Sequence, residues 1–302
     1  MRDGFVFVPA NTVVNAHYVG ALREFGDLAE AVGDAAGAAA ARANATALAA
    51  AMRARLFNAS AGAFVDGLGT AHAAVHSTAY ALARGVAGDD GGVAAAAWAA
   101  LVARLRAEAS VGIPVGPYPG LFYGEALFAN TSDHGRAAVA DFLLNNKTNG
   151  WLAQLRAGAT TTMESWAVAE KANLTWSHPW MAFALQLIAR WLLGVRALAP
   201  GYARVLVMPQ AGALARVSGA VPTVRGAITL AYAQSVGADG LPTAVAMNVT
   251  IPGAVSGRVC VAAGACSGGR VGVDGGVVTG EAEGDYWCVE VGAGAHAVVC
   301  PV

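Results

Sequence analysis

The sequence predicts a chain in two parts, helical over residues 1–201 and then a small antiparallel β-sandwich over residues 202–302. In the first part, apolar side chains recur at the three- and four-residue spacing of amphipathic helices. After Pro200 the pattern changes to short β-branched runs separated by glycine-rich turns, which is typical of a sandwich. A length of 302 residues also fits about two domains.

The helical part is predicted as a series of helices joined by loops. The first helix should stop at Gly33, because glycine favours the end of a helix. Its apolar stripe comprises Tyr18, Ala21, Leu22, Phe25, Leu28, Ala29 and Val32, and a second stripe comprises Leu48, Met52 and Leu56. Further helices are expected over residues 71–84, 93–108, 121–129, 135–144 and 180–193. Two loops, 112–120 and 149–151, are rich in glycine and aromatic residues and look functional.

The second part contains short runs with high β propensity. The run that starts at Arg204 ends at Pro209, since proline cannot donate a hydrogen bond within a sheet. The expected strands cover residues 204–209, 227–233, 243–250, 258–262 and 286–291.

Composition excludes several classes of protein. Nineteen basic residues balance 20 acidic ones and form no basic run, so nucleic acid is not an expected partner. The mean hydropathy of +0.49 raises the question of a membrane span. The longest apolar stretches are interrupted by Arg104 and Arg190, so no spanning helix is expected. The oligomeric state cannot be predicted from the sequence.

Two patterns predict a secreted glycoprotein. Six asparagines begin glycosylation sequons, more than composition explains: Asn44, Asn58, Asn130, Asn146, Asn173 and Asn248. Four cysteines lie near the end of the chain and predict disulfides, with three pairings possible: Cys260, Cys266, Cys288 and Cys300. Their spacing lacks CxxC pairs and nearby histidines, so zinc is not expected. Residues 1–12 lack a cleavage pattern, so the signal peptide is expected to be missing from this chain.

The strongest candidate for a functional site is the segment from residue 151 to residue 180. It contains four of the seven tryptophans, namely Trp151, Trp166, Trp176 and Trp180. Glu164 and His178 lie among them. Aromatic faces and an isolated carboxylate suit a sugar-binding site, in which the carboxylate handles a proton or a water molecule. The simpler alternative is a tryptophan-rich core helix with a surface glutamate.

Histidines spaced four residues apart suggest a second, weaker site. His72 and His76 would share one face of a helix, as metal ligands do. No HExxH pattern accompanies them, and packing or pocket-lining histidines explain the pair more simply. We therefore expect no metal.

Several motifs resemble the α-L-rhamnosidases of the six-hairpin glycosidase type. They are Gly158-Ala-Thr-Thr-Thr-Met-Glu-Ser-Trp166, Asn173-Leu-Thr-Trp-Ser-His-Pro-Trp180, Leu193-Gly-Val-Arg and Pro200-Gly-Tyr. Looser similarity extends over residues 5–235, including Val13-Val-Asn-Ala-His-Tyr18 and Val217–Gly226.

The resemblance implies an (α/α)6 toroid followed by a β-sandwich, and inverting hydrolysis of terminal α-L-rhamnose. Glu164 would be the general base that activates water, and His178 would bind a sugar hydroxyl. Trp166, Trp176 and Trp180 would line the pocket, with Trp151 in the same cluster; His76 matches a family histidine and implies a pocket role. The implied partner is a rhamnose-containing glycoside or polysaccharide, and no cofactor is implied.

The sequence also departs from the family pattern. Ala167 stands where the family usually has aspartate after the tryptophan, and Thr175 replaces another aspartate. No segment matches the upstream acidic motif that supplies the general acid. The chain therefore resembles the C-terminal half of the toroid plus the β domain. Two alternatives remain open: an inactive carbohydrate-binding or structural fragment, and another six-hairpin glycosidase or lyase.

Overall fold

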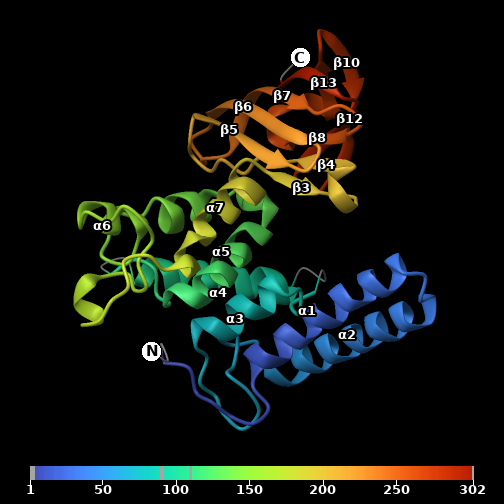
Figure 1. Cartoon of the computed structure of the whole chain (residues 1–302). Coiled ribbons are helices and arrows are strands. Elements are labelled where there is room, and N and C mark those ends of the chain that lie inside the picture. Colours follow the sequence, from blue (N-terminus) through green and yellow to red (C-terminus); the bar gives the residue numbers. More distant parts are fainter. Residues whose placement is uncertain (1–3, 89–91, 109–110, 301–302) are drawn as a thin grey trace. The chain divides into compact units, whose positions relative to one another are not determined.

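The computed structural model describes residues 4–88, 92–108 and 111–300 (Figure 1). Its internal contacts divide the chain into two compact units. The first unit comprises residues 1–129 and 145–181, and the second comprises residues 130–144 and 182–302. The second unit thus combines short helical segments with the β domain. The boundary that we place near residue 202 on sequence grounds stays a prediction.

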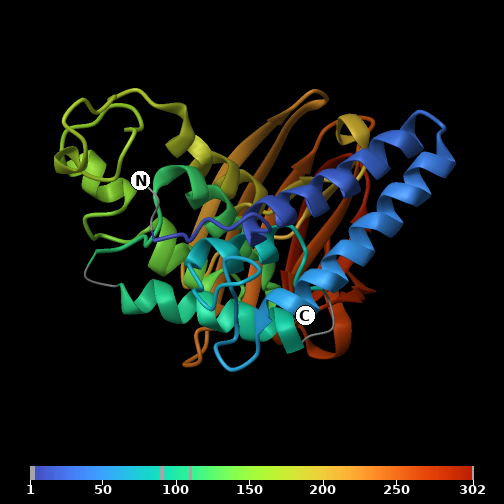
Figure 2. The ribbon, with the colours of Figure 1, turned by 90° about the horizontal axis from the view of Figure 1, so that it is seen from below.

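The first unit begins with a long helical hairpin formed by α1 (Thr12–Ala31) and α2 (Ala35–Leu56). Asn11 caps α1 by accepting a hydrogen bond from the backbone N–H of Val14, and Asp34 caps α2 in the same way. The turn between them is made at Gly33, which has a φ of 86°. Figures 1 and 2 both show the two helices lying side by side.

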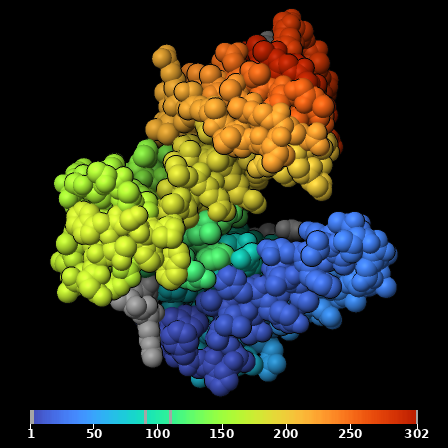
Figure 3. All heavy atoms as spheres, in the orientation of Figure 1, coloured from blue at the N-terminus to red at the C-terminus, as the bar shows by residue number. Residues whose placement is uncertain are grey.

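The large apolar residues of α1 face solvent, which corrects one expectation. Tyr18, Phe25, Leu28 and Val32 are between 53% and 74% exposed. The buried face of α1 consists mainly of small residues, including Ala16, Gly20, Gly26 and Ala29. The buried face of α2 is rich in alanine, so the two backbones can approach closely. The predicted stripe is therefore wrong for its largest members, which are exposed. Figure 3 shows the surface of this hairpin in blue.

The rest of the first unit contains shorter elements. These are β1 (Phe57–Asn58), β2 (Ala63–Phe64), α3 (Val75–Ala83), α4 (Gly92–Ala107), α5 (Pro117–Ala129), α6 (Trp151–Arg156) and the 3-10 turn η3 (Val168–Glu170). The expected helices over 71–84, 93–108 and 121–129 match α3, α4 and α5 with shifted ends. The last turn, η4 (Pro179–Ala182), leads into the second unit.

Asp66 holds several of these segments together. Its carboxylate is fully buried and accepts hydrogen bonds from the backbone N–H groups of Val6 and Ala74, both at 2.8 Å. It also contacts Ser77 Oγ at 2.7 Å and His72 Nδ1 at 2.6 Å. Burial alone raises the pKa of Asp66, but these hydrogen bonds outweigh it and the pKa lies below its ordinary value.

The second unit contains the remaining helical segments. They are η1 (Thr131–Asp133), the π-helical η2 (Ala137–Leu143), α7 (Phe183–Leu187), the π-helical η5 (Ile188–Leu192) and the short turns η6 (Pro200–Tyr202), η7 (Ala263–Ala265) and η8 (Ser267–Gly269). The helices predicted over 135–144 and 180–193 are therefore present, but both contain π-helical turns. Side-chain periodicity does not reveal such local widening.

Two sheets form the β domain. The six-stranded sheet has the order β10-β9-β13-β7-β6-β5, and the five-stranded sheet has the order β11-β12-β8-β4-β3. The strands are β3 (Val195–Ala197), β4 (Arg204–Val207), β5 (Arg216–Thr223), β6 (Gly226–Val236), β7 (Pro242–Ile251), β8 (Ser256–Ala262), β9 (Arg270–Val273), β10 (Gly276–Thr279), β11 (Glu281–Glu283), β12 (Tyr286–Val291) and β13 (Gly294–Cys300). One core cluster contains residues of both sheets, which makes the domain a sandwich. Among the strands of the described residues, β4 and β8 pair in parallel and the other pairs are antiparallel.

All four cysteines are joined in disulfides in the β domain. Cys260 and Cys288 occupy directly opposed positions of β8 and β12 and form one disulfide. Cys266 and Cys300 form the other. The structure thus selects one of the three possible pairings. Within its described residues, no helix is both long and apolar enough to cross a bilayer.

Candidate active site

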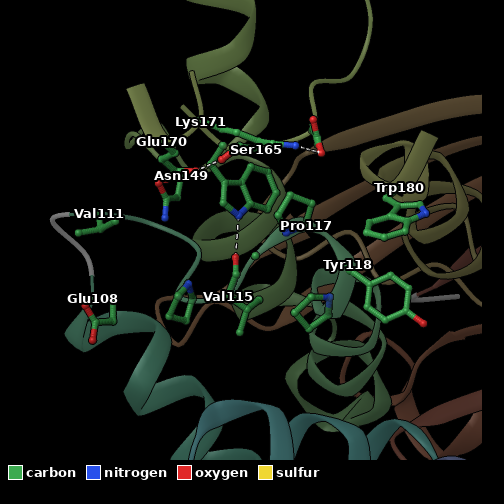
Figure 4. Close-up of a pocket in the computed structure, with 15 residues that line it drawn as sticks. Glu108, Val111, Val115, Pro117, Tyr118, Asn149, Ser165, Glu170, Lys171 and Trp180 are labelled. Carbon is green, nitrogen blue, oxygen red and sulfur yellow. Dashed lines mark hydrogen bonds and ion pairs between the residues drawn. The ribbon is translucent and has the colours of Figure 1, made fainter. Parts of the chain in front are cut away.

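A cavity of about 490 Å³ lies in the first unit and contains several of the predicted site residues (Figure 4). Its wall comes from the end of α4, the proline-rich loop before α5, and the segment between α6 and η4. The lining residues include Glu108, Val115, Tyr118, Asn149, Glu164, Ser165, Trp166, Glu170, Lys171 and Trp180. The two loops that look functional in the sequence, 112–120 and 149–151, therefore both contribute to this pocket.

Helix α6 and the loop after it position Glu164. Gln154 is buried on α6, and its amide accepts from the N–H of Met163 at 3.2 Å and donates to the carbonyl of Ser165 at 3.3 Å. These two contacts fix the residues on either side of Glu164. The backbone of Glu164 also donates to the carbonyl of Thr175 at 2.9 Å. The base candidate is thus held in place by its neighbours on both sides.

The carboxylate of Glu164 has two donors. Lys171 Nζ forms an ion pair with Oε1, and the backbone N–H of Thr175 donates to Oε2 at 3.1 Å. The pKa of Glu164 is lowered to about 2. The main cause is the hydrogen bond from Lys171, and the second is the hydrogen bond from the backbone of Thr175. Glu164 is therefore an ionised carboxylate at neutral pH. Its side chain is 23% exposed, so it remains accessible from the pocket.

The tryptophans predicted for the site differ in exposure. Trp166 lines the pocket but is only 2% exposed, and its Nε1 donates to the carbonyl of Val115 at 2.7 Å. Trp151 packs edge-on against Trp166, with ring centroids 5.2 Å apart, and donates to the carbonyl of Met181. Trp166 therefore forms part of the wall with little free surface, and Trp151, which does not line the cavity, packs against it. Trp180 and Trp176 are 54% and 44% exposed, and only Trp180 of these two lines the pocket.

His178 lies beside Trp180, with ring centroids 5.0 Å apart and nearly perpendicular planes. The segment 162–178 is fixed by hydrogen bonds between Thr162 and His178, one of them from the N–H of His178 to the carbonyl of Thr162 at 2.8 Å. Nε2 of His178 is buried and has no hydrogen-bond partner among the described residues. A polar atom of this kind has capacity for one more contact.

The structure separates the two histidines of the weaker site. α3 begins at Val75, so His72 precedes the helix and cannot share its face with His76. His72 contacts Asp66, whereas His76 is buried against the ring of Phe5. The spacing argument for a metal pair on one helix is therefore wrong, because the helix starts later than predicted. His76 does not line the pocket either.

One other cluster of possible metal ligands occurs among the described residues. It consists of Cys260, Cys288 and Glu283, but both sulfur atoms are already joined in a disulfide. A cystine offers no thiolate to a metal.

The sequons differ in local structure. Asn44, Asn146, Asn173 and Asn248 are exposed. The other two, Asn58 and Asn130, are half-buried, and each accepts hydrogen bonds from the serine of its own sequon.

Sequence reasoning missed Lys171, Tyr118, Gln154 and the pocket position of Glu170. Gln154 and Tyr118 lie on α6 and α5, and Glu170 and Lys171 lie at the end of η3, but no motif or apolar period marks any of the four. The glycine- and aromatic-rich composition of residues 112–120 was the one available signal, and it pointed to the loop that contains Tyr118.

The chain thus combines a helical unit, with a pocket lined by tryptophan and glutamate side chains, and a β-sandwich. Residues 1–193 match the family model of the bacterial α-L-rhamnosidase six-hairpin glycosidase domain, and residues 194–273 match that of the bacterial α-L-rhamnosidase C-terminal domain. The chain belongs to this family of glycoside hydrolases. The family resemblance and the predicted fold class are thereby confirmed. No curated protein matches the chain.

Several solved structures with a similar fold are α-L-rhamnosidases. The enzyme from Dictyoglumus thermophilum has a TM-score of 0.75 and 14% identity over 95% of this chain and 31% of its own. The Streptomyces avermitilis enzyme, complexed with L-rhamnose, has a TM-score of 0.74 and 17% identity, covering 96% of this chain and 27% of its own. A GH78 family rhamnosidase from Bacillus sp. GL1 is 27% identical, covers 76% of this chain and 24% of its own, and has a TM-score of 0.55. The chain thus spans less than a third of the length of these relatives.

Proposed function

We propose that this chain provides the base side of an inverting α-L-rhamnosidase site that removes terminal α-L-rhamnose from a glycoside or polysaccharide. Membership in the rhamnosidase family supports the substrate class. The likeness to a structure complexed with L-rhamnose agrees with it. The single observation on which the mechanism depends is the carboxylate of Glu164 at the pocket wall, with a pKa of about 2.

In this mechanism, Glu164 is the general base. An inverting glycosidase uses one carboxylate to remove a proton from water while the water attacks the anomeric carbon. Lys171 and Thr175 hold Glu164 in the ionised form that this role requires. Each bonded oxygen of a carboxylate retains acceptor capacity, so Glu164 can still accept a hydrogen bond from water.

His178 is proposed to bind a sugar hydroxyl through Nε2. The support is the lack of a hydrogen-bond partner for this buried atom among the described residues. His178 does not itself line the cavity, but its ring contacts that of Trp180, which does. The proposed bond would satisfy a buried polar atom that is otherwise costly.

The general acid is proposed to come from a segment outside this sequence. Protonation of the leaving oxygen needs a second carboxyl group. No part of the sequence resembles the acidic family motif that supplies it.

A second candidate function is carbohydrate binding without turnover. Ala167, in place of the usual family aspartate, favours it together with the lack of the acidic motif. In this case the pocket would bind rhamnose, and Glu164 would serve as a hydrogen-bond acceptor.

The experiment that tests the base role uses Glu164→Gln in a protein that joins this chain to the acid-bearing segment. Glutamine keeps the shape but cannot take a proton, so turnover of an aryl rhamnoside should fall at least about 100-fold while binding changes little. Glu125→Gln is the matched control, since Glu125 does not line the pocket. Near-normal turnover of the Glu164 variant would remove it from the mechanism. Rhamnose binding without turnover in the parent protein would favour the second function.

We also propose that the chain is secreted and glycosylated. The disulfides Cys260–Cys288 and Cys266–Cys300 support an oxidising compartment. Digestion of the natively produced protein with an N-glycosidase should lower its apparent mass, and an unchanged mass would contradict glycosylation.

A further inference from the structure

One face of α1 carries a continuous row of exposed apolar side chains. Its members alternate at spacings of four and three residues: Val14, Tyr18, Ala21, Phe25, Leu28 and Val32. We call this row the α1 stripe. The buried residues of α1 lie on its other faces, and the helix contacts α2 and α3. Packing among the described residues therefore leaves the α1 stripe largely uncovered.

The length and spacing of the α1 stripe are those of a surface that binds a helix. Single exposed apolar side chains are common, but this row runs about 27 Å along the helix axis. None of its members lines the pocket that contains Glu164, so that pocket does not account for them. A spacing of four and three residues keeps side chains in line with a second helix, whose own side chains fit between them. The partner of the stripe is therefore expected to be a helix.

The α1 stripe is complementary to itself when two copies of α1 run antiparallel and cross at Arg23. Positions equally far before and after Arg23 then face each other across the pair. The facing pairs are Val14 with Val32, Tyr18 with Leu28, and Ala21 with Phe25, each pair formed between the two copies. Near the centre, the large ring of Phe25 fills the space that the small Ala21 leaves. A parallel pair would instead place Phe25 on Phe25 and Ala21 on Ala21, which gives crowding at one layer and a gap at the next.

From this fit we infer that the α1 stripe binds the α1 stripe of a second copy of this chain, as an antiparallel pair with a twofold axis at Arg23. An interface of this symmetry uses the same surface on both copies. Charge does not oppose it, because acidic side chains beside the stripe are paired within their own copy. Glu24 pairs with Arg84 at 3.0 Å, and Asp27 pairs with Arg42 at 2.9 Å.

The area of the α1 stripe indicates a weak but specific dimer. Its five large side chains are between 53% and 74% exposed. At these fractions they offer roughly 500 Å² per copy, so the pair buries about 1,000 Å², near the lower limit for a specific interface. After the cost of association, such an area corresponds to a Kd on the order of 10 µM.

The first test measures the mass of the 302-residue chain by sedimentation equilibrium at about 1–200 µM, a range that brackets the expected Kd. The parent should pass from monomer to dimer within this range. Phe25→Asp puts a charge near the centre of the apolar interface and should raise Kd at least about 100-fold. Leu155→Asp is the matched control, because Leu155 is 64% exposed on α6 but lies outside the stripe, and it should leave Kd unchanged. Circular dichroism verifies that each variant is folded.

A second test determines the direction of the pair. Val14→Cys and Val32→Cys are prepared separately, and the native cysteines are already joined in disulfides. When the two variants are mixed and mildly oxidised, an intermolecular disulfide should form between them, because these positions face each other. Neither variant alone should cross-link, since the two new thiols of its dimer lie at opposite ends of the pair.

Each outcome decides for or against the dimer. A parent chain that stays monomeric up to about 200 µM would overturn the inference, and the stripe would then bind another helix, such as one from the acid-bearing segment. Equal dimerisation of Phe25→Asp and the parent, or loss of the dimer in Leu155→Asp, would overturn it by placing the interface elsewhere. Cross-linking of Val14→Cys with itself would overturn the antiparallel arrangement. A dimer that Phe25→Asp abolishes, with a new disulfide only in the mixed sample, supports the inference.

Discussion

Replacing Lys171 with methionine tests how the structure controls the charge of Glu164. Methionine keeps the length of the lysine side chain but removes its ammonium group, which is the main cause of the low pKa of Glu164. An opposite charge at hydrogen-bond distance lowers a carboxyl pKa by about 1–3 pH units. Loss of Lys171 should therefore move the pKa of Glu164 from about 2 to roughly 3–5, while the N–H of Thr175 still holds the other oxygen.

The change is large enough to measure directly. With a pKa of about 2, roughly a tenth of Glu164 is protonated at pH 3, whereas with a pKa of about 4 roughly nine-tenths is protonated. The assay follows the side-chain carboxyl ¹³C shift between pH 1.5 and 7, with the Glu164 signal assigned from Glu164→Gln. Lys171→Arg keeps the positive charge and should titrate like the parent. A Lys171→Met signal that still titrates near pH 2 would refute the reasoning.

The same pair predicts a dependence of stability on pH. The pKa of Glu164 is lower in the folded chain than its ordinary value of 4.5. Its contribution to stability is therefore present above about pH 4.5 and is lost as the pH falls toward 2. Urea unfolding should show a larger difference between parent and Lys171→Met at pH 6 than at pH 2. An equal difference at both values would contradict this assignment.

Two further predictions concern stability. Asp66→Asn replaces a carboxylate that accepts several hydrogen bonds with an amide that also donates. The substitution should lower the free energy of unfolding, measured in urea titrations, by about 2–4 kcal/mol. A change below about 0.5 kcal/mol would show that Asp66 is not a structural anchor. The cysteines, Cys260, Cys266, Cys288 and Cys300, should resist alkylation in unreduced secreted protein. Each of the two disulfides closes a loop of about 30 residues and should contribute roughly 3–4 kcal/mol to the free energy of unfolding. Free thiols in such material would contradict both the pairing and secretion.

The sequence predicted several strands of the β domain, including the two longest, β6 and β7. The expected strand at 286–291 coincides with β12, and those at 227–233 and 243–250 fall within β6 and β7. It missed β3, β9, β10 and β11, which are three or four residues long, and also the longer β5 and β13. Such short pairs depend on neighbouring strands for their hydrogen bonds, and their local patterns are too brief to identify them.

The error on α1 has a different physical cause. Periodicity identified a helix but could not tell which face is buried. Size favoured burial of Phe25 and Leu28, yet the alanine-rich α2 packs against small residues such as Gly26 and Ala29. Burial depends on the partner helix, which a single-helix pattern does not contain.

The candidate site was predicted only in part, because its chemistry lies in irregular loops. Motif similarity identified Glu164 and the tryptophans, and the structure brings Glu164, Trp166 and Trp180 into one pocket. Motif similarity gave no indication that Lys171 pairs with Glu164. That pair depends on the path of the chain between residues 164 and 175, where no period constrains the side chains.

The last prediction is that the 302-residue chain alone releases no rhamnose. Inverting hydrolysis needs a protonated acid beside the ionised base. Besides Glu164, the described pocket carboxylates are Glu108 and Glu170.

Each of these two already serves as an acceptor. Arg104 pairs with Glu108 at 3.2 Å, and Ser165 donates to Glu170. Neither arrangement presents a proton to a leaving oxygen, and Glu164, with a pKa of about 2, cannot hold one at neutral pH. The chain should therefore bind an aryl rhamnoside without cleaving it. Nitrophenol release by the purified chain at a rate above that of Glu164→Ala would show that Glu108, Glu170 or another group acts as the acid.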